Sequence, residues 1–204
     1  MLFDDTYLTI AQPAEGVFKD KGSKFLAFAH PVTSEEQVKD IVATYRKQYF
    51  DARHHCYAYM IGAHHQLFRS SDDGEPSGTA GRPILGQIQS HQLTNILIVV
   101  VRYFGGVLLG TSGLIQAYKL ASVDVISNAS VIEEIVQHHF EITFPYELMN
   151  DVMRILKDDA MSFATPEYTL TCKICFGVRQ TKVDLVCAKL KKIEGIQLTE
   201  IEMC

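Results

Sequence analysis

The longest apolar run of the chain follows Asn95 and ends at Val101, with the sequence Ile-Leu-Ile-Val-Val-Val. A continuous run rich in β-branched residues is typical of a strand that is buried on both faces. Eight of the 13 glycines lie between Asp72 and Gly113, on either side of this run. Because glycine permits positive φ angles and close backbone approach, we expect these flanking segments to form a shaped surface around a central strand.

Alternating and helical patterns predict the other elements of the first part of the chain. Ser34 is expected to cap a helix with Gln37 as its capping-box partner, and Thr111 or Ser112 is expected to cap another. Lysines between Lys19 and Lys24 interrupt one strand, which indicates a hairpin tip or a bulge. We expect strands at residues 7–11, 16–31, 53–61, 66–69 and 95–101, and helices starting near residues 34, 83 and 112.

After residue 129 the order of the patterns changes. We expect a strand at 133–146, a helix at 147–158, strands at 161–164 and 168–177, a helix at 181–193 and a strand at 196–203. This β-α-β-β-α-β order is that of the ferredoxin-like arrangement. The sequence therefore predicts an α+β protein with two domains, residues 1–130 and 131–204.

The overall charge argues against a protein that coats duplex nucleic acid. The 204 residues carry a net charge of −5, whereas such proteins are strongly basic. A local basic patch is still compatible with this balance, and the lysines of the interrupted strand are candidate RNA contacts: Lys19, Lys21 and Lys24.

The chain has neither a positively charged secretory start nor an apolar run of membrane-spanning length. We expect a cytoplasmic protein with reduced thiols. Cys172 and Cys175 form a C-x-x-C on an expected strand, where their side chains leave from opposite faces. His54 and His55 are separated in the same way, so we expect local hydrogen bonds from these histidines and neither a metal site nor a cofactor.

The first glycine-rich segment carries three carboxylates within four residues, Asp72, Asp73 and Glu75. Such a group can hold Mg²⁺ or perform acid–base chemistry. Alternatively, the carboxylates cap backbone N–H groups of the turn and of the helix that begins near Pro83.

The second glycine-rich segment precedes a helix, and free N–H groups at a helix start suit a phosphate or carboxylate. Tight packing of the loop on the strand is the alternative. Arg102 ends the buried run, so its guanidinium can reach the acidic residues if the first loop folds over it. The candidate ligand-binding residues are Asp72, Asp73, Glu75, Gly78, Arg82, Arg102, Gly105, Gly106, Gly110, Thr111 and Ser112.

Four segments of the sequence are similar to those of the Impact family. The segments Asp-Asp-Gly-Glu-Pro-Ser-Gly-Thr-Ala-Gly-Arg-Pro from Asp72 and Val-Val-Arg-Tyr-Phe-Gly-Gly-Val-Leu-Leu-Gly from Val100 resemble the family signature. The segments Asp-Ala-Arg-His-His-Cys-Tyr-Ala-Tyr from Asp51 and Lys-Gly-Ser-Lys-Phe from Lys21 add to the resemblance, which fits the bacterial two-domain form. It implies an N-terminal domain like domain 2 of ribosomal protein S5 and a ferredoxin-like C-terminal domain, folds that occur side by side in translocase-type elongation factors.

The resemblance also implies a connection to translation, because eukaryotic relatives act in translational control through a stress-kinase pathway. We expect a binding or regulatory module, rather than an enzyme, that contacts RNA, the ribosome or a translation-related protein. One alternative is an enzyme acting on a phosphorylated small molecule or nucleotide, with Asp72, Asp73 and Glu75 holding metal and Arg82 and Arg102 holding the anion. A purely structural, dimerising protein is the other alternative.

Overall fold

The computed structural model describes residues 5–165, 167–168 and 171–201. The chain has the expected mixed α+β class and forms two compact units. One unit is Tyr7–Glu134, and the other combines Met1–Thr6 with Ile135–Cys204. Independent folding of residues 131–204 as a domain stays a prediction.

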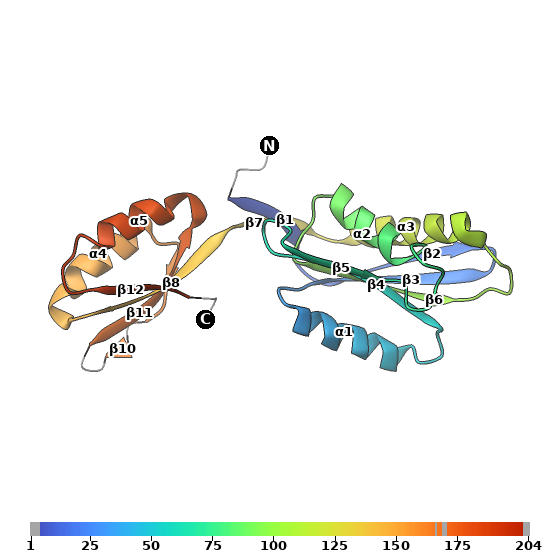
Figure 1. Ribbon diagram of the computed structural model, residues 1–204, viewed down its shortest axis with the longest axis horizontal. Coiled ribbons are helices and arrows are strands. Elements are labelled where there is room, and N and C mark those ends of the chain that lie inside the picture. Colours follow the sequence, from blue (N-terminus) through green and yellow to red (C-terminus); the bar gives the residue numbers. More distant parts are fainter. Residues whose placement is uncertain (1–4, 166, 169–170, 202–204) are drawn as a thin grey trace. The chain divides into compact units, whose positions relative to one another are not determined.

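An antiparallel five-stranded sheet forms the centre of the unit Tyr7–Glu134, with strand order β2-β3-β6-β4-β5. One face carries the single helix α1, and the other carries α2 and α3 (Figure 1). The strands are β2 (Ala14–Asp20), β3 (Ser23–Pro31), β4 (His54–Ile61), β5 (Leu67–Ser71) and β6 (Ile96–Tyr103), and the helices are α1 (Glu35–Gln48), α2 (Gly81–Ser90) and α3 (Gly110–Asn128).

Strand β6 is the middle strand of this sheet, and its apolar run is buried on both faces, as predicted. Ile96, Ile98 and Val100 belong to one core cluster with residues of α2 and α3. The alternate residues Leu97, Val99 and Val101 pack on the other face with residues of α1. The continuous apolar run thus reflects helices on both sides of an antiparallel sheet.

The interruption between Lys19 and Lys24 is a hairpin tip rather than a bulge. Strands β2 and β3 pair in continuous register up to Asp20 and Ser23. Lys21 has φ 43° and Gly22 has φ 80°, as a type I′ two-residue turn requires. The tip therefore holds one lysine in the left-handed region and places two others on the paired strands.

The predicted cap of α1 is present, but that of α3 is wrong. The Ser34 hydroxyl accepts a hydrogen bond from the Gln37 N–H at 3.3 Å, while the Gln37 side chain accepts from the Thr33 N–H at 2.8 Å. Helix α3 begins at Gly110 after Leu109, and no side chain caps it. Thr111 and Ser112 therefore lie inside its first turn.

The single strand expected at 133–146 is two strands in the structure. Strand β7 (Val131–Ile135) pairs with β1 (Thr6–Ile10), whereas β8 (Gln137–Phe144) enters the second sheet. The break falls at Val136, whose N–H donates to the Asp5 carbonyl and whose carbonyl accepts from Gln180 N–H. In the sequence, Ile135 and Val136 are adjacent apolar residues and the next three residues are polar, so strict alternation resumes only at Phe140 and the single expected strand ran across this break.

The second sheet has the order β10-β11-β8-β12, with β9 also paired to β11. Its core combines Phe140, Ile142 and Phe144 of β8 with residues of β11 and of both helices. The expected strand 168–177 is β10 and β11, separated by a segment whose residues 169–170 lie outside the description. The elements are α4 (Met149–Asp159), β9 (Ser162–Phe163), β10 (Glu167–Tyr168), β11 (Cys172–Arg179), α5 (Val183–Leu190) and β12 (Gln197–Ile201), with 3-10 turns at Tyr146–Leu148 and Gln180–Lys182.

Within the residues that the structure describes, no helix has both the length and the apolar content needed to cross a membrane.

Candidate functional site

The acidic loop after β5 is held together by its own carboxylates. Asp72 accepts hydrogen bonds from the N–H groups of Gly78, Ala80 and Gly81 at 2.8–3.0 Å, so it caps the loop and the start of α2. Burial alone would raise the pKa of Asp72, but these N–H donors, with Arg82, lower it below its ordinary value. Of the two roles predicted for the acidic segment, Asp72 therefore has the second one, which is to cap backbone N–H groups.

Asp73 connects the loop to α1 and to the start of β4. Its carboxylate accepts from the Arg46 guanidinium at 2.5 Å and from the His55 N–H at 2.7 Å. Its backbone carbonyl is 2.9 Å from His54 Nδ1, and the His55 ring bonds the Tyr49 carbonyl at 3.1 Å. Both histidines thus make local hydrogen bonds, as expected.

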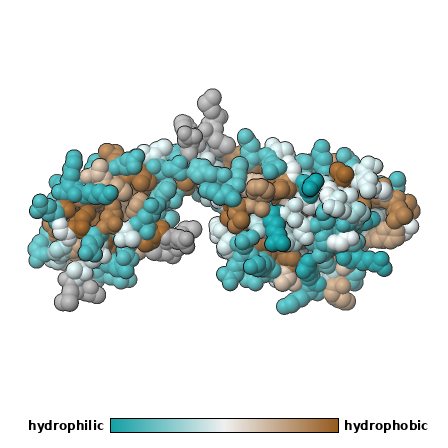
Figure 2. Space-filling view, in the orientation of Figure 1, coloured by the Kyte–Doolittle hydropathy of each residue, from teal (hydrophilic) through white to brown (hydrophobic). Residues whose placement is uncertain are grey.

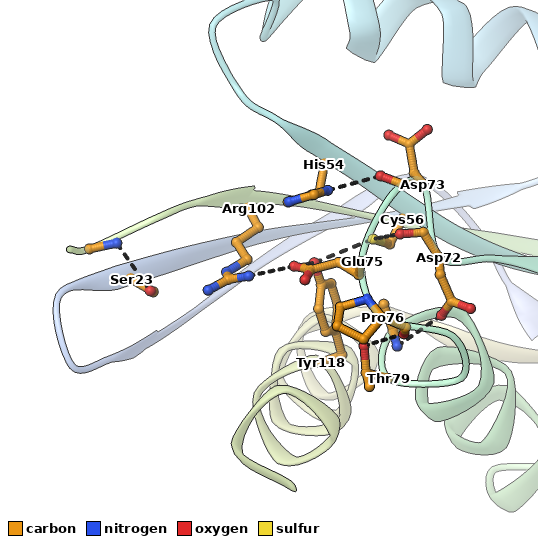
Figure 3. Close-up of polar contacts among 12 residues, drawn as sticks. Ser23, His54, Cys56, Asp72, Asp73, Glu75, Pro76, Thr79, Arg102 and Tyr118 are labelled. Carbon is orange, nitrogen blue, oxygen red and sulfur yellow. Dashed lines mark hydrogen bonds and ion pairs between the residues drawn. The ribbon is translucent and has the colours of Figure 1, made fainter. Parts of the chain in front are cut away.

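Glu75 forms a buried ion pair with Arg102. The Arg102 guanidinium donates to the Glu75 carboxylate at 2.6 Å, and the Tyr118 hydroxyl of α3 donates to the same oxygen at 2.8 Å (Figure 3). The Cys56 thiol donates to the Tyr118 oxygen at 3.3 Å, and burial raises the pKa values of both the thiol and the phenol. The network therefore contains one charge pair and two neutral groups that stay protonated at neutral pH.

Arg102 lies between two aromatic rings. Its guanidinium carbon is 5.6 Å from the centre of the Phe25 ring and 5.7 Å from that of Phe104, within the range of cation–π attraction. Arg102 is only 7% exposed, and its Nε is the one buried side-chain polar atom among the described residues that has no hydrogen-bond partner. An unsatisfied buried donor costs stability and marks this arginine as a candidate anion-binding group.

The two glycines after β6 serve different purposes. A Cβ on Gly105 would lie 1.9 Å from the Gly22 carbonyl carbon, so Gly105 packs directly on the β2–β3 turn. Its N–H also donates to the Ser23 hydroxyl at 3.1 Å. Gly106 has φ 86° and open space around the position of a Cβ, so it shapes the loop without packing.

The loop that follows exposes large apolar side chains, a feature that the sequence did not indicate. Phe104 is 53% exposed, Val107 52% and Leu108 83%. Figure 2 shows hydrophobic surface at the end of this unit where Figure 1 places the connection from β6 to α3. The exposed surface at this end of the unit is therefore partly apolar, whereas the charged residues of the neighbouring loops had predicted a polar surface.

The structure brings some candidate ligand-binding residues together and leaves others apart. Asp72, Asp73 and Glu75 share one loop, and Arg102 reaches Glu75 as predicted. Arg82 lies beside Gly78, where a Cβ would be 3.5 Å from the Arg82 side chain. Gly110, Thr111 and Ser112 form the exposed, uncapped start of α3. Ligand binding by this set stays a prediction.

None of the three carboxylates of the acidic loop belongs to a group of described residues that is arranged to bind a metal ion. Within the described ranges, no group of three or more His, Cys, Asp or Glu side chains is arranged to hold a metal ion. Asp72, Asp73 and Glu75 are instead directed at backbone N–H groups and arginines. Each of the three carboxylates therefore already has a hydrogen-bond or ion-pair partner within the protein.

The lysines of the hairpin adjoin a groove on the α1 face of the sheet. Lys19 and Lys24 are cross-strand partners, and both line a groove of about 570 Å³. Its aromatic wall, Tyr49, could not be predicted from the sequence, because this residue lies beyond the end of α1 and far from the lysines along the chain. The hairpin register alone would have placed the two lysines on one face.

Comparisons with known proteins give a consistent result. A family model described as the Impact N-terminal domain matches residues 21–126. IMPACT family member YvyE of Bacillus subtilis is 31% identical over 75% of this chain and 70% of its own length. IMPACT family member YigZ of Escherichia coli is 43% identical over 56% of this chain, and the match spans 57% of that relative.

A structural match covers nearly the whole chain. A crystal structure of a hypothetical protein is 30% identical and aligns with 98% of this chain and 99% of its own, with a TM-score of 0.75. Both units described above therefore occur together in a solved protein.

Proposed function

The chain belongs to the Impact family, and on this premise we propose that it is a cytoplasmic, translation-associated binding module that contacts RNA. The family resemblance supports the connection to translation, because eukaryotic Impact proteins act in translational control. RNA, free or in the ribosome, is the partner whose chemistry fits the exposed cations of this chain best.

The observation that carries this proposal is the β2–β3 hairpin. Lys19, Lys21 and Lys24 are all exposed, and none takes part in an ion pair among the described residues. In contrast, Arg46 and Arg102 are occupied by carboxylates of the acidic loop. On a chain with a net charge of −5, cations that remain without partners on one hairpin are suited to contact phosphates.

The two finer fold assignments agree with this proposal. We infer a ferredoxin-like arrangement for the second unit because its sheet, read as β12-β8-β11-β10, has helices after β8 and after β11. For the first unit, the likeness to domain 2 of ribosomal protein S5 rests on the family resemblance. Both fold types occur in proteins of the translation apparatus.

Binding to tRNA and to ribosomes tests the proposal directly. The affinity of the full chain should fall with salt, with a log–log slope of roughly −0.7 for each single-strand phosphate contact. Fluorescence anisotropy with labelled tRNA and co-sedimentation with ribosomes, each over a salt series, measure this. Undetectable association at low salt in both assays would overturn the RNA proposal.

A second candidate function is binding of a phosphorylated small molecule or nucleotide at Arg102. The unpartnered Nε of this buried arginine is the observation in its favour. A thermal-shift screen with nucleotides, with and without Mg²⁺, tests it. Stabilisation that disappears in an Arg102→Gln variant supports this function, whereas an unchanged melting temperature with every compound rejects it.

A further inference from the structure

The α1 face of the sheet is only partly covered, and this leaves a groove beside the edge strand β2. Val38 and Val42 of α1 pack over β3, β6 and β4 together with Phe28 and Val99. The groove lies beyond this contact, with a volume of about 570 Å³, and its lining includes Val17, Leu26, Phe28 and Tyr49. It is large enough for one nucleotide, since typical small-molecule sites have volumes of about 300–1,000 Å³.

The floor and one wall of the groove are apolar and aromatic. Val17 pairs with Leu26 across the two strands, so both side chains lie on this face. Val17 is 46% exposed although it is β-branched and apolar. The Tyr49 and Phe28 rings lie 5.5 Å apart, and Phe28 stacks on Tyr45 at 4.4 Å. The wall is therefore a rigid aromatic cluster on which a flat ring can pack.

One end of the groove carries an unneutralised pair of cations. Lys19 and Lys24 occupy directly opposite positions of the hairpin, and both line the groove. Like charges at such positions destabilise a strand pair. No ion pair among the described residues involves either lysine. An anion between the two ammonium groups would remove this repulsion.

The other end of the groove is rich in acceptors and is fixed in position. The Asp124 carboxylate accepts from the Val17 N–H at 2.8 Å, and the Asn128 amide donates to the Glu15 carbonyl at 2.9 Å. These bonds attach the start of β2 to α3. They leave the exposed side chain of Glu15 beside the apolar floor.

We propose that this groove binds a nucleotide of single-stranded RNA, a refinement that rests on the RNA-binding function proposed above. The phosphate lies between Lys19 and Lys24, and the base packs on Val17 and Tyr49. The Glu15 carboxylate accepts a hydrogen bond from an exocyclic amine of the base, as carboxylates do from the cytosine amine. Duplex RNA is excluded because its base faces are stacked inside the helix.

Two consequences follow for ligand preference. Cytidine and adenosine carry exocyclic amines, whereas uridine does not, so oligocytidylate and oligoadenylate should bind more tightly than oligouridylate. The groove should also prefer single strands to duplexes of the same sequence, because stacking of the base on the wall requires an exposed base.

The test compares short fluorescein-labelled oligocytidylate bound to the full chain and to two double variants. Lys19→Thr/Lys24→Thr should weaken binding by at least about tenfold at low salt and reduce the salt slope by about 1.4, which is the loss of two single-strand phosphate contacts. The control Lys39→Thr/Lys157→Thr removes the same charge from exposed positions that do not line the groove. It should leave the affinity within about twofold, since distant surface charges are screened by salt.

Folding of the variants does not confound this test. Removing opposed like charges from a strand pair, with threonine as a good strand former, should leave the melting temperature unchanged or higher. A further variant, Val17→Glu, adds an anion to the floor of the groove at an exposed position and should also weaken binding. Chemical-shift changes in the backbone amides of β2, β3 and Tyr49 on titration with the oligonucleotide would locate the site.

Three results would overturn the inference. They are equal losses in the groove and control variants, duplex binding as tight as single-strand binding, and chemical-shift changes confined to other surfaces. If the full chain associates with ribosomes or tRNA while any of these holds, the proposed function stands and the groove is the wrong site. If it associates with neither and the oligonucleotide does not bind, both proposals fail.

Discussion

Removing the Glu75 carboxylate should be among the most destabilising single changes in the unit Tyr7–Glu134. Glu75→Ala leaves the guanidinium of Arg102, which is 7% exposed, without its counter-ion at 2.6 Å. It also removes the acceptor of the Tyr118 hydroxyl. Breaking a buried pair by deleting one partner costs about 3–5 kcal/mol. For a chain of this size, such a loss lowers the melting temperature by roughly 6–20 °C.

A double variant separates the cost of an unpaired charge from the value of the pair itself. Glu75→Leu/Arg102→Met replaces both charges with apolar groups, which is often close to neutral for a buried ion pair. The Tyr118 hydroxyl still lacks its acceptor, at a cost of about 1–3 kcal/mol. The double variant should therefore be more stable than Glu75→Ala, and Glu75→Gln, which keeps an acceptor for both donors, should lie between Glu75→Ala and the unmodified chain.

Urea and thermal unfolding of these variants, followed by circular dichroism, provide the measurement. Removing the second charge should recover stability that removing the first one lost. A free energy of unfolding for Glu75→Ala within about 1 kcal/mol of that of the unmodified chain would refute this account, because a buried arginine without a counter-ion should cost more than that. A double variant less stable than the single one would refute it equally.

Four further changes test other parts of the structure by the same unfolding measurements. Asp72→Ala removes the acceptor of three N–H groups around the start of α2 and should cost about 0.5–2 kcal/mol, as loss of a helix cap does. Gly105→Ala places a Cβ 1.9 Å from the Gly22 carbonyl carbon and should cost about 3 kcal/mol, whereas Gly86→Ala meets open space inside α2 and should stabilise by about 0.5–1 kcal/mol. Hydrogen bonds from Arg179 and Thr181 lower the pKa of Asp5 from 3.8 to about 2, so the stability it provides is complete above pH 3.8 and is lost as the pH falls toward 2. The destabilisation by Asp5→Asn should therefore be largest at neutral pH and shrink over that interval, and a loss that is the same at both ends contradicts the assignment.

The Asp5 contacts also refine the predicted division of the chain. The expected domain of residues 131–204 carries a complete β-α-β-β-α-β order. In the structure, however, Asp5 binds the Arg179 and Thr181 side chains and its carbonyl accepts from Val136 N–H. A fragment of residues 130–204 should give a dispersed amide spectrum but unfold at a lower denaturant concentration than the same unit in the full chain.

Local sequence signals predicted most of the elements of the fold. The apolar run before Arg102 identified the central strand because every position in it is buried by a helix on one face or the other. Ser34 identified the start of α1 because its hydroxyl serves an N–H three residues away. Both signals depend only on residues that are close together in the chain.

Features that depend on distant partners could not be predicted in the same way. The start of α3 lacks a side-chain cap, so the nearby Thr111 was misleading. The division of 133–146 into two strands depends on Asp5, which is more than a hundred residues away in the sequence.

The same limit applies to the candidate site. Proximity in the sequence showed that Asp72, Asp73 and Glu75 share a loop, and the end of the buried strand indicated that Arg102 could reach it. Their individual partners could not be inferred, because Tyr118 comes from a helix that follows much later in the chain. The groove depends on how much of the sheet α1 leaves uncovered, which is a property of packing.

Co-sedimentation of the full chain with ribosomes at low salt, with the Lys19→Thr/Lys24→Thr variant measured beside it, tests the central claim most directly. The proposed function predicts that the unmodified chain pellets with ribosomes and that added salt releases it, with the variant released at a lower salt concentration. Failure of the unmodified chain to pellet at low salt, or association that is independent of both salt and the two lysines, would contradict it.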